Sequence, residues 1–112
     1  GDAAIRYVSS VLSDGLRDDD AVCRLGGEEF LVIFPNTDIG MAIQCMTRCR
    51  ERIERAKCTA DGQEMPLAIS AGVASRSGST NTVEELLRAA DKALFQAKEG
   101  GRNRVVQSST TR

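Results

Sequence analysis

The chain has 112 residues, with 15 lysines and arginines, 16 acidic residues and no histidine. This length fits one domain, and a formal net charge of −1 provides no basic field, so nucleic acid is not an expected partner. The absence of histidine excludes Ser-His-Asp and Cys-His catalysis and histidine-ligated zinc. Any catalysis must therefore use carboxylates, lysines, arginines, backbone groups or a carboxylate-bound metal ion.

Cys23, Cys45, Cys49 and Cys58 form neither a Cys-x-x-Cys pair nor a zinc-binding spacing. Cys45 and Cys49 lie four residues apart in an apolar helical stripe, which predicts small buried side chains; a disulfide is the alternative. No apolar run approaches the roughly 20 residues that span a bilayer. No secretory signal is visible at the N-terminus either, so we expect a cytoplasmic chain without a membrane segment.

Apolar residues at helical spacing predict a first helix near the N-terminus. Its stripe consists of Ala4, Ile5, Val8, Val11, Leu12 and Leu16, with Gly15 near the end. An acidic loop at 18–20 follows. Two β-prone runs, at 22–25 and 29–34, are joined by Gly26 and Gly27, and this pattern predicts a hairpin. Pro35 ends the second strand because proline cannot donate to a strand ladder.

Asp38 is placed to cap a second helix. The expected core stripe of this helix is Met41, Ala42, Cys45, Met46, Cys49, Ile53 and Ala56, and Arg48, Arg52 and Arg55 lie off that stripe. Asp61 and Gly62 mark a second hairpin turn. The run 67–74 that follows is apolar on both faces, which fits a buried strand.

Residues 75–81 form a polar loop, and Thr82 to Glu85 has the pattern of a capping box that opens a third helix. The stripe of this helix is Val83, Leu86, Leu87, Ala90, Leu94 and Ala97. Gly100 and Gly101 end the helix, a last strand covers 104–107, and 108–112 has the character of a disordered tail. The expected order is α-β-β-α-β-β-α-β.

The strongest local signal is the run Gly26-Gly27-Glu28-Glu29-Phe30. Two glycines at a hairpin tip allow the backbone to approach a ligand closely. Carboxylates beside such a tip suit Mg²⁺, which binds one or two carboxylates together with substrate phosphates. A plain hairpin with solvated acids is the alternative.

This run resembles the signature of the GGDEF family, the diguanylate cyclases, in its Glu-Glu form. Further segments agree with the family at its own spacing. These are Gly1-Asp2, the Arg-x-x-Asp motif from Arg17 to Asp20, the strand Ser70-Ala71-Gly72-Val73, and the block from Ala90 to Asn103 in which Phe95 replaces a tyrosine. The resemblance covers essentially the whole chain.

The resemblance implies an α+β fold with a mainly antiparallel sheet flanked by helices, the ferredoxin-like palm of nucleotidyl cyclases. It also implies a bacterial signalling enzyme, a transferase that condenses two GTP into cyclic di-GMP as a homodimer. By similarity, Glu28 and Glu29 are catalytic and bind Mg²⁺ or Mn²⁺, which neutralises phosphate charge. Gly26 and Gly27 would lie against the GTP.

Asp2 matches the acid that accepts hydrogen bonds from the guanine edge, although a simple helix N-cap is the alternative. Lys98 and Arg102 match the cations that reach the GTP triphosphate. From the residues alone, these two could equally interact with the helix dipole.

Arg17 and Asp20 match an inhibitory site that binds the product cyclic di-GMP, and Arg48 matches the arginine that completes it. The alternative for the acidic loop is a solvated charge run. Arg24 would stabilise the hairpin or link the two sites.

The family pattern continues upstream of Gly1, with an Asp-x-Leu-Thr segment, a central strand carrying an Asp-x-Asp metal site, and a guanine-binding Asn. We therefore expect residues 1–107 to be a partial GGDEF domain that is inactive as given, and an upstream sensory domain in the full-length protein. The strands next to the central strand would lack hydrogen-bond partners. If this chain folds alone, we expect a swap or an altered dimer to fill that gap.

Two other functions stay open. A noncatalytic receptor would bind cyclic di-GMP through Arg17, Asp20 and Arg48, whereas a pure dimerisation module would bind no nucleotide. A receptor has no need of both Glu28 and Glu29, so these acids favour the cyclase.

Overall fold

The computed structural model describes residues 2–26, 29–60, 62–76 and 81–108, without the side chains of Asp2, residues 57–60 and Met65. The elements, in chain order, are α1 (Asp2–Asp14), β1 (Ala21–Gly26), β2 (Glu29–Ile33), α2 (Ile39–Arg55), β3 (Lys57–Ala60), β4 (Gln63–Pro66), β5 (Ala71–Val73), α3 (Val83–Glu99) and β6 (Val105–Gln107). No helix in these ranges combines the length and apolar composition that crossing a bilayer requires.

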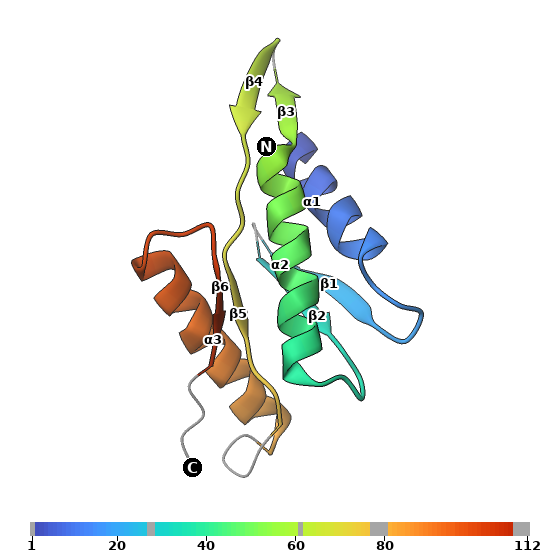
Figure 1. Ribbon diagram of the computed structural model, residues 1–112, viewed down its shortest axis with the longest axis vertical. Coiled ribbons are helices and arrows are strands. Elements are labelled where there is room, and N and C mark those ends of the chain that lie inside the picture. Colours follow the sequence, from blue (N-terminus) through green and yellow to red (C-terminus); the bar gives the residue numbers. More distant parts are fainter. Residues whose placement is uncertain (1, 27–28, 61, 77–80, 109–112) are drawn as a thin grey trace.

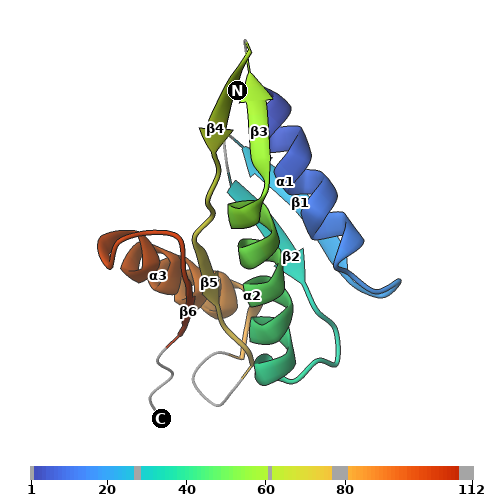
Figure 2. The same ribbon diagram turned by 45° about the horizontal axis from the view of Figure 1, so that its top comes forward.

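Helix α2 occupies the middle of the molecule (Figure 1). Helix α1 packs along one side of α2, strands β5 and β6 contact the other side, and α3 covers β5 and β6 from outside. The β1–β2 hairpin lies behind α2 in this view. Turning the molecule shows the β3–β4 hairpin projecting beyond the start of α1 (Figure 2).

The described strands form three separate two-stranded ladders. β1 pairs antiparallel with β2, and β3 pairs antiparallel with β4, whereas β5 and β6 run parallel. The parallel pairing follows from the helical crossover through α3. The α+β class, with antiparallel hairpins flanked by helices, agrees with the expectation. No ladder joins β2 to β5 within the described ranges.

The stretch after α2 differs from the predicted order by one strand. A hairpin does form here, between β3 and β4, but its second strand is β4 (Gln63–Pro66) rather than the apolar run 67–74. Asp61, predicted to lie in its turn, is outside the described residues. Only Ala71–Val73 of that run is a strand, and its partner is β6. The final strand, β6, lies within the predicted range 104–107. Ser108, predicted to belong to the disordered tail, is instead held beside β5, because its N–H donates to the Val73 carbonyl at 2.7 Å. Residues 109–112 lie outside the described ranges.

The main core lies between α1 and α2 and extends to β5. Its buried members are Val11, Leu12, Ala42, Cys45, Met46, Cys49, Ile53 and Val73. Ile53 and Val11 are almost completely enclosed. Three stripe residues predicted to be in the core are instead exposed: Met41 (56%), Val83 (72%) and Leu87 (43%). Each lies near the start of its helix, where fewer neighbouring elements cover the apolar stripe.

Gly72 allows β5 to lie directly on α3. A Cβ added there would overlap the backbone nitrogen of Leu94 and the backbone oxygen of Ala90. On the α3 side, Ala93 lies at this contact, and Ala93 and Ala97, one helical turn further on, are 1% and 0% exposed. Small residues on both elements therefore set the spacing between the strand and the helix.

We expect Gly72→Ala to destabilise the fold by about 3 kcal/mol or more, because the overlap is with backbone atoms that cannot rotate away. Gly40→Ala is the matched control. The new methyl group would meet only the Asp38 carboxylate, at 3.8 Å. That change should be neutral or stabilising by about 0.5–1 kcal/mol, since alanine favours helix. Urea unfolding measures both; equal stability of the two variants would refute the packing argument.

Both predicted helix caps are present. Asp38 accepts a hydrogen bond from the Gly40 N–H at 3.2 Å at the start of α2. At α3, Thr82 Oγ1 accepts from the Glu85 N–H at 3.1 Å, and Glu85 Oε1 accepts from the Thr82 N–H at 3.0 Å and the Asn81 N–H at 2.9 Å. These backbone donors lower the pKa of Glu85 below its ordinary value of 4.5.

A lowered pKa means that the ionised form of Glu85 contributes stability above the unfolded value, near pH 4.5, and that this contribution is lost as pH falls further. Glu85→Gln keeps an acceptor for the cap but cannot ionise, so its thermal midpoint should fall less steeply than wild type below pH 4.5. Glu84→Gln, in the same turn, is the control. Parallel acid profiles for wild type and Glu85→Gln would contradict the prediction.

Candidate functional site

The glycine-rich hairpin tip requires an unusual backbone at Gly26. This residue has φ +145° and follows a β-bulge between Arg24 and Gly26. An added Cβ would meet no atom of the described residues within 4 Å, so the backbone angle, rather than crowding among those residues, favours glycine here. Gly27 and Glu28, both predicted site residues, lie outside the described ranges.

Glu29 connects the hairpin to the C-terminal end of α3. Its Oε2 lies 4.0 Å from Lys98 Nζ, and both side chains are partly exposed, at 55% and 39%. Two predicted site residues that are 69 positions apart in the sequence are therefore neighbours. A carboxylate, which is a hard oxygen ligand for metal ions, and a lysine ammonium group therefore lie side by side at a solvent-accessible position.

Arg102 lies in a tight turn just beyond Lys98. The turn has three successive positive φ angles, at Gly101 (+119°), Arg102 (+63°) and Asn103 (+49°). The Arg102 N–H donates to the Ala97 carbonyl at 2.9 Å, and its carbonyl accepts from Arg104 Nε at 3.0 Å. The backbone is thus held from both sides while the side chain is exposed.

The donor set here fits a hard cation only in part. Glu29 offers carboxylate oxygens, which Mg²⁺ and Mn²⁺ prefer. Among the residues that the structure describes, no group of three Cys, Asp or Glu side chains could hold a metal ion without further ligands. A site at Glu29 would therefore need other oxygens, such as substrate phosphates. Asp2 is the first residue of α1, and its side chain is not described.

Arg17 and Asp20 form a second cluster, in the loop after α1. Asp20 Oδ2 accepts from the Arg17 N–H at 2.9 Å and lies 3.5 Å from Arg17 Nε. Arg17 Nη2 also donates to Thr37 Oγ1, which itself donates to the Pro35 carbonyl at 2.9 Å. The Asp20 side chain is only 2% exposed, and its Oδ1 is buried without a hydrogen-bond partner.

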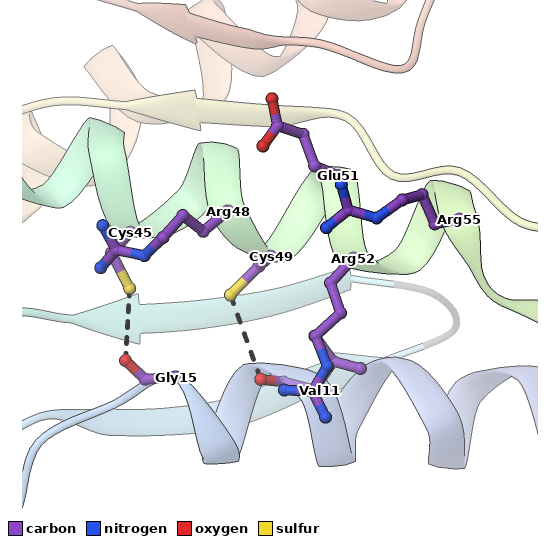
Figure 3. A pocket seen from close by; sticks show the side chains of 8 residues that line it. All are labelled: Val11, Gly15, Cys45, Arg48, Cys49, Glu51, Arg52 and Arg55. Carbon is purple, nitrogen blue, oxygen red and sulfur yellow. Dashed lines mark hydrogen bonds between the residues drawn. The ribbon is translucent and has the colours of Figure 1, made fainter.

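Arg48 lines a cavity of about 430 Å³ between α1 and α2. The other lining residues are Val11, Gly15, Cys45, Cys49, Glu51, Arg52 and Arg55 (Figure 3). Gly15 precedes Arg17 by two residues, so the cavity lies next to the Arg17–Asp20 loop. Three arginines against one glutamate give this cavity a positive lining. Arg52 Nη2 also lies 3.4 Å from Asp14 Oδ2 of α1.

The thiols of Cys45 and Cys49 point from α2 toward α1 (Figure 3). Cys45 Sγ donates to the Gly15 carbonyl at 3.4 Å, and Cys49 Sγ donates to the Val11 carbonyl at 4.0 Å. Burial, followed by the neighbouring Cys45, raises the pKa of Cys49 to about 11. Cys23, Cys45 and Cys49 are free, so the prediction of small buried side chains at 45 and 49 is confirmed.

Sequence reasoning missed several polar residues that support these clusters. Thr37 holds Arg17, and Arg50, Glu54 and Ser70 bond to Asn103 beside Arg102. Arg50 and Glu54 are four residues apart, a spacing that predicts only a helical ion pair. The partner at 103 became visible only in three dimensions.

The sequence matches one family model, described as diguanylate cyclase, GGDEF domain, over residues 1–104. Curated relatives include diguanylate cyclase A of Treponema denticola, 34% identical over 96% of this chain and 29% of that protein. The response regulator PleD of Caulobacter vibrioides is 41% identical over 95% of this chain and 24% of its own length. The chain thus spans about a quarter of these relatives.

Solved structures of the same kind share the fold. The GGDEF domain of DgcB from Caulobacter crescentus, in complex with c-di-GMP, has a TM-score of 0.91 and 28% identity, over 97% of this chain and 65% of that one. The active GGEEF domain of a diguanylate cyclase from Vibrio cholerae has a TM-score of 0.86 and 25% identity, over 98% of this chain and 69% of that one. The expected cyclase palm is therefore confirmed.

Proposed function

We propose, from the premise that this chain belongs to the GGDEF family of diguanylate cyclase domains, that residues 1–107 bind GTP within a homodimeric cyclase. In this proposal the two nucleotides, one from each domain, are condensed into cyclic di-GMP. The cyclic product would act as an inhibitor through Arg17, Asp20 and Arg48. An upstream sensory domain would supply the signal.

The observation that carries the GTP site is the proximity of Glu29 and Lys98, at 4.0 Å. A triphosphate needs a cation to pair with its oxygens and a carboxylate to share a metal ion with them. Arg102, in the next turn of the chain, adds a second exposed cation. In this proposal Asp2 accepts hydrogen bonds from the guanine edge, and the backbone of Gly26 and Gly27 lies against the nucleotide.

Glu28 and Glu29 are the proposed ligands of Mg²⁺ or Mn²⁺. Either ion, when bound with GTP, would neutralise charge on the phosphates. Glu29 is 55% exposed, so its carboxylate is accessible to a hydrated ion that enters with the nucleotide. Lys98 would then exchange its partner from Glu29 to a phosphate oxygen.

Asp20 supports the inhibitory site. A buried carboxylate oxygen without a hydrogen bond is costly, and a guanine N–H would satisfy Oδ1 of Asp20. Arg17, 60% exposed, presents its guanidinium at the same loop. The DgcB domain, a neighbour in structure, is in complex with c-di-GMP.

A noncatalytic receptor for cyclic di-GMP is the second candidate, and it is favoured by the same unpaired Asp20 oxygen. The two candidates differ at the hairpin. A receptor gains nothing from Glu29 beside Lys98, whereas a GTP-binding cyclase uses both. We therefore place the cyclase first.

Lys98→Ala and Arg102→Ala are each expected to weaken GTP binding in Mg²⁺ by about tenfold or more, because each removes one charge-assisted contact to phosphate. Lys92→Ala, an exposed lysine of α3, is the control and should bind like wild type. Calorimetric titration measures the affinities. Unchanged binding in both test variants would contradict the assigned site. The expected inactivity of the chain on its own remains a prediction, which assaying the same samples for cyclic di-GMP tests.

Arg17→Ala should weaken cyclic di-GMP binding by about tenfold or more, because the paired hydrogen bonds of the guanidinium are lost. Arg6→Ala, an exposed arginine of α1, serves as the control. Titration with cyclic di-GMP, together with light scattering for the oligomeric state, gives the readout. If Arg17→Ala bound cyclic di-GMP with wild-type affinity, both the proposed inhibitory site and the receptor candidate would be contradicted.

A further inference from the structure

We propose that Asn103, held by Arg50 and Glu54 of α2, is a positioning residue that presents Arg102 to the triphosphate. This inference rests on the proposed function, in which Arg102 contacts phosphate. The residues that hold Asn103 lie about 50 positions earlier in the chain, on a helix that contributes nothing else to the proposed GTP site.

The turn needs such support because its backbone is intrinsically unfavourable. Arg102 and Asn103 have φ angles of +63° and +49°, directly after Gly101 at +119°. Residues with a Cβ rarely adopt the left-handed region, although asparagine tolerates it better than most. Two such residues in succession imply that contacts elsewhere determine the turn.

Asn103 makes these contacts in three directions. Its Oδ1 accepts from Arg50 Nη1 at 3.1 Å, its Nδ2 donates to Glu54 Oε2 at 2.8 Å, and its N–H donates to Ser70 Oγ at 3.1 Å. Arg50 Nη1 also donates to Glu54 Oε1 at 3.0 Å. The side chains of Asn103, Arg50 and Glu54 thus bond to one another in a closed ring.

Charge strengthens this ring. Arg50 is 18% exposed, which reduces competition from water for its hydrogen bonds. The hydrogen bond from Asn103, followed by that from Arg50, lowers the pKa of Glu54, so the carboxylate is ionised at neutral pH. Hydrogen bonds to ionised groups are stronger than neutral ones.

The ring fixes the backbone next to Arg102 but leaves the Arg102 side chain available. The Arg102 guanidinium makes no hydrogen bond or ion pair with any residue that the structure describes, whereas its N–H and carbonyl are both bonded. A fixed backbone with a free cationic side chain is a preorganised phosphate contact, because less freedom is lost when the ligand binds.

Two variants break the ring at different members. Glu54→Ala removes the acceptor on α2 without altering the turn itself. Asn103→Asp keeps the side-chain shape and the tolerance for positive φ, but it directs a carboxylate at Glu54. Glu54→Gln, which keeps an acceptor for Asn103, is the conservative rescue. Glu51→Ala is the matched control for GTP binding, since Glu51 pairs with Arg50 at 3.7 Å, whereas the hydrogen bonds of Asn103 to described residues go to Arg50, Glu54 and Ser70.

The experiment combines titration of GTP in Mg²⁺, titration of cyclic di-GMP, and hydrogen exchange of the Arg102 amide. In Glu54→Ala and Asn103→Asp we expect GTP affinity to fall about five- to tenfold and the Arg102 amide to exchange faster. Glu54→Gln and Glu51→Ala should stay within about twofold of wild type. Cyclic di-GMP affinity should be unchanged in Glu54→Ala, Asn103→Asp and Glu54→Gln, which separates positioning from a general loss of structure.

Wild-type GTP affinity in Glu54→Ala and Asn103→Asp would overturn the positioning role and leave the proposed function intact. An equal loss of GTP and cyclic di-GMP binding would also overturn it, because the ring would then serve only the fold. Absence of GTP binding by the unmodified chain would instead overturn the proposed function, and the positioning role with it.

Discussion

The fold is organised around α2, whose apolar stripe is buried by elements that pack on two of its sides. Ile53 is 0% exposed, and Cys49 and Ala42 are 4% and 5% exposed, so this face of α2 is enclosed. Helix α1 covers one side and β5 with β6 covers the other. The loop that carries Arg17 follows the first of these elements, and the turn that carries Arg102 precedes β6 in the second. One helix therefore fixes the positions of both proposed ligand sites.

The polar side chains of α2 extend this arrangement. Arg52 lies 3.4 Å from Asp14 on α1, and Arg50 and Glu54 reach Asn103 beside β6. Arg52 lies on the opposite side of α2 from Arg50 and Glu54, because helix residues two positions apart point to different sides. A single helix thus combines a buried stripe with two lateral polar connections, each of which ends near a different proposed site.

Much of this could be predicted from the sequence. Periodicity located the three helices, and local chemistry identified the caps at Asp38 and Thr82 because capping depends on neighbouring residues. The family resemblance placed Glu29 and Lys98 in one site, and the structure has them adjacent. The pairing of β5 with β6 was not predictable from pattern, since a three-residue strand carries almost no periodic signal. The contacts of Asn103 were missed for another reason: its partners are 33, 49 and 53 residues away, and each has an ordinary local interpretation.

The arrangement of the cysteines has a practical consequence for chemical labelling. Cys45 and Cys49 are buried, and burial raises the pKa of Cys49 to about 11, so the Cys49 thiol stays protonated at neutral pH. Cys23, on the solvent-exposed part of β1, lies three residues before Gly26. A thiol-reactive fluorophore should therefore prefer Cys23 to these two buried thiols. A label on Cys23 would report from the strand that leads directly into the glycine-rich hairpin, without any engineered cysteine at that position.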